Sequence, residues 1–200
     1  MMTDDLTTRA SSPAQMDKLR RAMLDKFAPS RSAGSYPSTS CLLLDRSGSM
    51  CCPVGDRSFR STRIEELRKL SKQFPGVRRF QYNGYIQELR PDDEIGDADG
   101  DNNEPLAFNT LKKAGITHCV MITDGGADDP PKALLAAIGL KIDVFYVGPD
   151  PVPKFLRDLA KQTGGEYGSA SLSAIKELGQ AITQRLGLPA PVGKKGPIAL

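Results

Sequence analysis

The stretch CLLLDRSGSM, residues 41–50, contains the change from apolar to polar residues that decides the fold. Its first four residues have the composition of a buried strand, and that strand stops abruptly at the carboxylate of Asp45. Two hydroxyls follow at alternate positions, Ser47 and Ser49, and the glycine between them lets the backbone turn so that both point at one place. Such hard oxygen donors suit Mg²⁺, Mn²⁺ or Ca²⁺ better than zinc or copper. The stretch therefore predicts a divalent-metal site at the end of a buried strand.

Strand-like and helix-like segments alternate along the chain after this stretch begins. The predicted strands are Cys41–Leu44, Val77–Tyr82, Tyr85–Leu89, His118–Thr123, Ile142–Val147 and a short one near Tyr167. The predicted helices are Thr62 or Arg63 to Phe74, Pro105–Ala114, Pro131–Leu140, Pro153–Thr163 and Leu172–Leu186. The pair Asn83-Gly84 predicts a hairpin turn between the second and third strands. The alternation predicts an α/β fold with a doubly wound, mostly parallel six-stranded sheet, flanked by helices and carrying one antiparallel edge strand.

The sequence predicts one domain between two segments of different composition. Residues 1–38 hold a predicted helix at 12–27, with apolar side chains at helical spacing, and most of a linker rich in Ser, Pro and Gly. Residues 39–187 form the α/β domain. Residues 188–200 form a Pro- and Gly-rich tail without a core-forming pattern.

Composition excludes several classes of protein. With 200 residues, 39% of them hydrophobic, the chain can bury one sizeable core, and no apolar stretch approaches the roughly 20 residues of a membrane span. The first residues lack the pattern of a secretion signal, and the four cysteines lack metal-ligand spacing, so we expect a cytoplasmic protein with reduced thiols. A net charge of +3 and few aromatics among the basic residues argue against nucleic-acid binding.

Two further acidic residues fall where the sheet would bring them toward the serine loop. The strand that ends at Thr123 is followed by Asp124, a second strand-terminal carboxylate, and then by two glycines. Glu104 precedes Pro105 at the start of a predicted helix, where a side chain is free to reach a metal. In doubly wound sheets ligands bind beyond the carboxyl ends of the strands. We therefore expect Asp45, Ser47, Ser49, Glu104 and Asp124 to form the metal site.

These motifs resemble the von Willebrand factor A (vWA) family, in particular its bacterial and phage intracellular members. The resemblance covers about residues 39–186 and rests on DRSGSM at 45–50, RIEEL at 63–67, ITDG at 122–125, VGPD at 147–150 and LAKQTGGEY at 159–167. It implies a Rossmann-like vWA fold with a metal-ion-dependent adhesion site, or MIDAS. Ser47 and Ser49 would then bind the metal, Mg²⁺ or else Mn²⁺ or Ca²⁺, through their hydroxyls. Asp45 and Asp124 would hold it directly or through water.

The chain departs from the family pattern in one place. The family usually offers a threonine in its second loop, whereas NNEPL at 102–106 places Glu104 there; Thr110 lies too far inside the helix to replace it. Three carboxylates would hold a dication more tightly and attract a further carboxylate less. Glu104 is therefore either an internal substitute for a partner's acidic residue, or it points into solvent and a water takes the threonine's place.

The resemblance implies a metal-dependent protein–protein interaction module, acting as an adaptor or an assembly component. Partners of two kinds are implied: a MoxR-like AAA+ ATPase in a bacterial cytoplasm, or the proteins of a phage virion, in which the domain would be an accessory or structural scaffold. No membrane role is expected. The partner would supply an acidic residue at the metal.

Enzyme activity is the alternative that the residues favour least. A phosphatase with Asp45 as nucleophile normally needs a second aspartate where this chain has Ser47, and His118, which begins a strand, offers no nucleophile–base pair. The alternating Asp97, Asp99 and Asp101 do not form an EF-hand, because its glycine and final glutamate are missing. We therefore expect no catalysis, with a Mg²⁺-dependent phosphatase as the second alternative.

Overall fold

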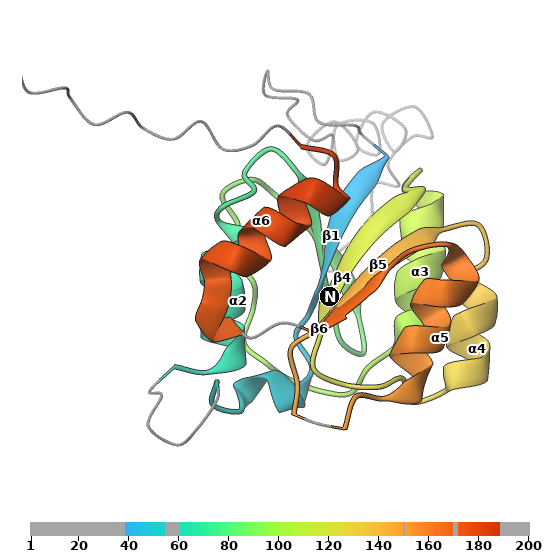
Figure 1. Ribbon diagram of the computed structural model, residues 1–200, viewed down its shortest axis with the longest axis horizontal. Coiled ribbons are helices and arrows are strands. Elements are labelled where there is room, and N and C mark those ends of the chain that lie inside the picture. Colours follow the sequence, from blue (N-terminus) through green and yellow to red (C-terminus); the bar gives the residue numbers. More distant parts are fainter. Residues whose placement is uncertain (1–38, 55–60, 150, 170–171, 189–200) are drawn as a thin grey trace, which may run out of the picture. The chain divides into compact units, whose positions relative to one another are not determined.

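The apolar segments of the sequence become the strands of a single sheet (Figure 1). The computed structural model describes residues 39–54, 61–149, 151–169 and 172–188. The strands are β1 Ser40–Asp45, β2 Arg78–Tyr82, β3 Ile86–Leu89, β4 His118–Thr123, β5 Lys141–Tyr146 and β6 Tyr167–Ser169. The helices are η1 Gly48–Cys51, α2 Arg63–Ser71, α3 Glu104–Lys113, α4 Pro130–Ala136, α5 Lys154–Thr163, η2 Leu172–Ala174 and α6 Ile175–Arg185. The predicted N-terminal helix at 12–27 and all but the first residue of the predicted tail at 188–200 lie outside the described residues.

The sheet has the predicted topology within the described part of the chain. Its strand order is β3-β2-β1-β4-β5-β6, and every neighbouring pair is parallel except β2 with β3. That antiparallel edge pair is the hairpin predicted from Asn83-Gly84, and its register places Tyr82 opposite Ile86. The chain moves from β1 to one side of the sheet and reaches β4 on the other. The carboxyl ends of these two strands therefore flank the switch point where such sheets bind ligands.

Helices cover both faces of the sheet because successive residues of its central strand point to opposite sides. Leu42 and Leu44 of β1 lie in the apolar core beneath α2 and α6. Cys41 and Leu43 lie in the other core, beneath α3, α4 and α5. Figure 1 shows these two groups of helices on opposite sides of the strands. The central strands are thus buried on both faces, which explains their continuous apolar sequences.

Two helices, α2 and α4, end three or more residues earlier than their apolar pattern predicts. Helix α2 stops at Ser71 rather than Phe74, because the chain tightens into three-residue bonds from Gln73 N–H to Leu70 and from Phe74 N–H to Ser71. Helix α4 stops at Ala136, and the positive φ of 88° at Gly139 takes the chain out of the helix and toward β5. Neither difference moves a residue of the expected metal site.

The structure also bears on the predictions about the cysteines and about membrane-spanning segments. The four cysteines, all within the described residues, are free thiols, and Cys41 and Cys119 occupy neighbouring positions on β1 and β4. No helix in the described ranges has both the length and the apolar character to cross a bilayer.

Candidate metal centre

Two buried carboxylates meet at the switch point between β1 and β4. Asp45 is the last residue of β1, and Asp124 directly follows the last residue of β4. Because Leu44 pairs with Ile122 in the parallel register, both carboxylates leave the same edge of the sheet. Asp45 is 0% exposed, and the side chain of Asp124 is also 0% exposed. The fold therefore places these two predicted site residues side by side.

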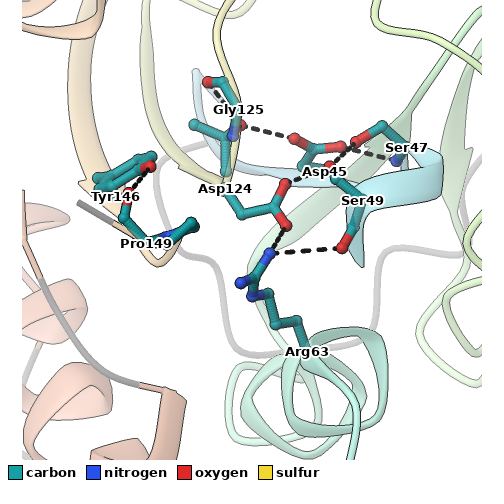
Figure 2. A network of polar contacts seen from close by, with 9 residues as sticks. Asp45, Ser47, Ser49, Arg63, Asp124, Gly125, Tyr146 and Pro149 are labelled. Atoms are coloured by element: carbon teal, nitrogen blue, oxygen red, sulfur yellow. Dashed lines mark hydrogen bonds and ion pairs between the residues drawn. The ribbon is translucent and has the colours of Figure 1, made fainter. Parts of the chain in front are cut away.

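The serine loop connects the two carboxylates through hydrogen bonds (Figure 2). The backbone N–H of Ser47 donates to Oδ1 of Asp45 at 2.7 Å. The hydroxyls of Ser47 and Ser49 lie 3.1 Å apart, and Ser49 Oγ donates to Oδ1 of Asp124 at 2.6 Å. Gly48 does not need a positive φ in this turn, and its N–H donates to the carbonyl of Gly100 at 2.9 Å. Four of the five predicted residues thus form one connected polar cluster.

Thr123 belongs to this cluster although the sequence analysis did not select it. Its hydroxyl donates to Oδ2 of Asp45 at 2.6 Å, so both oxygens of that carboxylate accept a hydrogen bond. Burial raises the pKa of Asp45 to about 6; the bonds from Thr123 and Ser47 oppose this shift, and the charge of Asp124 adds to it. A threonine that ends an otherwise apolar strand was the signal available in the sequence.

Glu104 is buried but, unlike those of Asp45 and Asp124, its carboxylate has no hydrogen-bond or ion-pair partner on any other described residue. It is 1% exposed, which excludes the alternative in which it points into solvent. Neither of its carboxylate oxygens has a hydrogen-bond partner among the described residues. Burial is the main cause that raises the pKa of Glu104 to about 8; its own backbone N–H opposes the shift, while Asp45 and Asp128 add to it. A buried carboxylate without a partner is costly and calls for a cation or a proton.

The N-terminus of α3 fixes the position of Glu104. Asn103 caps the helix by accepting from Leu106 N–H at 3.2 Å, and Pro105 occupies the first turn. The Asn103 N–H donates to the carbonyl of Asn83 at 3.1 Å, and the Asn83 side chain donates to the carbonyl of Asp99 at 2.8 Å. Asn83, in the β2–β3 turn, is therefore bonded both to the backbone of the acidic segment at Asp99 and to the N-cap residue that precedes Glu104.

The donors present fit a hard divalent cation that also takes hydroxyl or water ligands. In the described residues, no three Asp, Glu, His or Cys side chains converge closely enough to hold a metal by themselves. The unpartnered oxygens of Glu104, together with Oδ1 of Asn102, show buried acceptor capacity that the described protein atoms do not use. Hydroxyls of Ser47 and Ser49 lie at the same edge of the sheet. This set of oxygen donors matches the chemistry of Mg²⁺ or Mn²⁺.

Arg63 is the second residue that the sequence analysis missed. It is the first residue of α2, and Figure 2 shows its side chain reaching from that helix to the cluster. Its Nη1 forms an ion pair with Oδ2 of Asp124 and also lies 3.4 Å from the carbonyl oxygen of Ser49. Asp124 therefore has a partner on each oxygen, in contrast to Glu104.

Comparisons with known proteins agree with this architecture. No protein-family model and no curated protein matches the sequence. Among solved structures, the chain is similar to a von Willebrand factor type A protein from Catenulispora acidiphila, with 17% identity and a TM-score of 0.55 over 74% of this chain and 42% of that one. It is also similar to proximal thread matrix protein 1 from the mussel byssus, with 11% identity and a TM-score of 0.50 over 72% of this chain and 44% of that one.

A second structure of the mussel protein, with a zinc-occupied MIDAS motif, matches with 10% identity and a TM-score of 0.52 over 88% of this chain and 52% of that one. The chain thus spans about half the length of these proteins. At such low identity the likeness concerns the fold. The chain has the vWA fold, as its sequence motifs predicted.

Proposed function

We propose that this vWA-fold domain binds a divalent metal ion at the β1–β4 switch point and uses it to bind another protein. The observation that carries the proposal is the buried carboxylate of Glu104, which lacks a hydrogen-bond partner among the described residues and whose pKa is raised in part by the charge of Asp45. Asp45 in turn belongs to the hydrogen-bonded cluster with Ser47, Ser49 and Asp124. A cation there would satisfy acceptors that are otherwise costly to bury.

Each residue has a distinct role in the proposed site. Ser47 and Ser49 would offer their hydroxyl oxygens, and Glu104 its free carboxylate. Asp45, which accepts bonds from Ser47 and Thr123, would orient the serine loop and balance the charge, as would Asp124 from the other strand. When bound, Mg²⁺, or Mn²⁺ or Ca²⁺, would supply an electrophilic position to which an oxygen donor of a partner can bind.

The biological setting of the module is also proposed. The vWA fold supports an adaptor or assembly role, and we propose a MoxR-like AAA+ ATPase or the proteins of a phage virion as the partners. The corresponding locations are the cytoplasm and the virion. In the second setting the domain would be an accessory or structural component.

Removing both serine hydroxyls should abolish metal binding. The Ser47→Ala/Ser49→Ala double variant should show no heat of Mg²⁺ or Mn²⁺ binding by calorimetry, while its circular dichroism remains that of the wild type. Because a ligand that binds only the folded state stabilises it, Mg²⁺ should raise the melting temperature of the wild type but not of the variant. Ser61→Ala, outside the cluster, is the control. Unchanged affinity in the double variant would remove the serine loop from the site.

A binding role is proposed in preference to phosphatase activity. Both oxygens of Asp45 accept hydrogen bonds, from Ser47 and Thr123, which makes this carboxylate a poor nucleophile. With Mg²⁺ present, a generic phosphatase substrate should therefore be hydrolysed no faster than in a protein-free blank. A pull-down with this protein as bait should recover the AAA+ ATPase or the virion proteins, and a chelator should abolish this recovery. Turnover that disappears in Asp45→Asn would support the enzyme alternative instead.

A further inference from the structure

Arg63 places a positive charge directly beside the cluster formed by Asp45, Ser47, Ser49 and Asp124. Its side chain is 13% exposed, whereas that of its partner Asp124 is 0% exposed, so Arg63 is the more solvent-accessible member of the pair. The same Nη1 also lies within reach of the Ser49 carbonyl, on the loop that offers the proposed serine ligands. The guanidinium of Arg63 therefore contacts both halves of the site, the loop after β1 and the end of β4.

The position of Arg63 in its own helix does not explain its presence. A cation at the first residue of a helix faces the positive end of the helix dipole, where an acidic side chain is preferred. The unfavourable interaction of Arg63 with the helix dipole is offset by its ion pair with Asp124, which lies outside the helix. By contrast, Arg68 lies near the end of the same helix and pairs with Asp97, whose side chain is 97% exposed. The two arginines share one helix but only Arg63 contacts the cluster.

Asp124 can balance only a limited amount of positive charge. One of its oxygens accepts from Ser49 and the other is paired with Arg63. A dication held close to Ser49 would need the negative charge of Asp124 and would repel the guanidinium beside it. Metal binding should therefore weaken the Arg63–Asp124 ion pair, and the ion pair should lower the affinity of the site for the metal.

We propose that Arg63 is a tethered cation that competes with the divalent metal for Asp124 and so sets the metal affinity of the site. In the metal-free protein the guanidinium neutralises Asp124 and holds the serine loop. Metal binding displaces the guanidinium of Arg63 from Oδ2 of Asp124 and leaves it free at the solvent-accessible side of the cluster. This inference rests on the proposed metal-binding function and adds to it the residue that opposes binding.

The test compares Mn²⁺ binding, measured by calorimetry at fixed pH and ionic strength, in the wild type, Arg63→Gln and the control Arg68→Gln. The two variants lose the same charge from the same helix, so any general effect of net charge is common to both. Arg63→Gln should bind Mn²⁺ about tenfold more tightly than the wild type, as expected when about 1.4 kcal/mol of competing interaction is removed. Arg68→Gln should bind within about twofold of the wild type, because its ion pair is exposed and screened.

Metal-free measurements separate this inference from the proposed function. Without metal, Arg63→Gln should melt below Arg68→Gln, and Arg63→Lys, which keeps the charge, should lie between Arg63→Gln and the wild type in both stability and affinity. If the wild type binds Mn²⁺ and Arg63→Gln binds it equally or more weakly, the competition is overturned while the metal site stands. If neither protein binds Mn²⁺, the metal site itself fails, and the inference fails with it.

Discussion

Glu104→Gln should stabilise the metal-free protein in alkaline solution by several kcal/mol and weaken its binding of Mg²⁺ at least tenfold. The pKa of Glu104 is raised by burial to about 8 from an ordinary value of 4.5, so above pH 8 the folded state must hold an ionised carboxylate that lacks a partner among the described residues. A shift of that size corresponds to roughly 5 kcal/mol of lost stability. Glutamine has no charge to bury, and it offers the metal a weaker ligand.

The pH dependence of stability follows with a definite sign. Because the folded pKa of Glu104 lies above its unfolded value, the folded protein retains a proton that the unfolded chain loses, and stability falls as pH rises from about 4.5 to 8. Asp45 adds a smaller fall between its ordinary value of 3.8 and about 6. Urea denaturation in a chelator should therefore show a decline up to pH 8 in the wild type and little decline between pH 6 and 8 in Glu104→Gln.

Added Mg²⁺ should reduce the decline in the wild type, because the metal favours the ionised carboxylate. The control is Glu66→Gln, in which another buried glutamate is changed, one whose carboxylate already has Lys69 as partner at 2.6 Å. Its Mg²⁺ affinity should equal that of the wild type. A wild-type stability that stays flat or rises from pH 6 to 8 would show that the pKa of Glu104 is not raised in the folded protein.

Local sequence signals were sufficient for the fold and for most of the cluster. An apolar run of four to six residues ended at Asp45 and again before Asp124, and parallel pairing then required the two carboxylates to share one edge. The serine hydroxyls followed from their spacing alone. These features depend on strand composition and on chain order, both of which can be read without knowing any long-range contact.

The remaining features depend on contacts between distant segments. Arg63 and Asp124 are 61 residues apart, and Thr123 and Asp45 are 78 apart, so nothing local indicated either pairing. The burial of Glu104 could not be decided from sequence because a residue at a helix start can face either solvent or the core. Its environment is fixed by the bonds from the Asn83 turn to Asp99 and Asn103.

Among Gly→Ala changes at the described glycines, Gly165→Ala should cause the largest loss of stability. A Cβ at this position would lie 1.9 Å from the carbonyl oxygen and 2.4 Å from the carbonyl carbon of Ile142, and 2.9 Å from the nitrogen of Asp143. These are backbone atoms of β5, which is bonded to β4 on one side and to β6 on the other. Because neither the strand nor the end of α5 can move away without breaking these pairings, we expect a cost of about 4 kcal/mol or more.

The adjacent glycine provides a matched control within the same TGGEY motif. Gly164 ends α5 with a φ of 71°, but an added Cβ there would meet no atom within 4 Å. Gly164→Ala should therefore cost only the strain of a left-handed alanine, roughly 1 kcal/mol. Urea denaturation of both variants would measure the difference. Equal losses of stability would show that α5 and β5 can move apart to make room for the added methyl group. A much larger loss for Gly165→Ala would show that Gly165 is required by close packing and Gly164 by its backbone conformation.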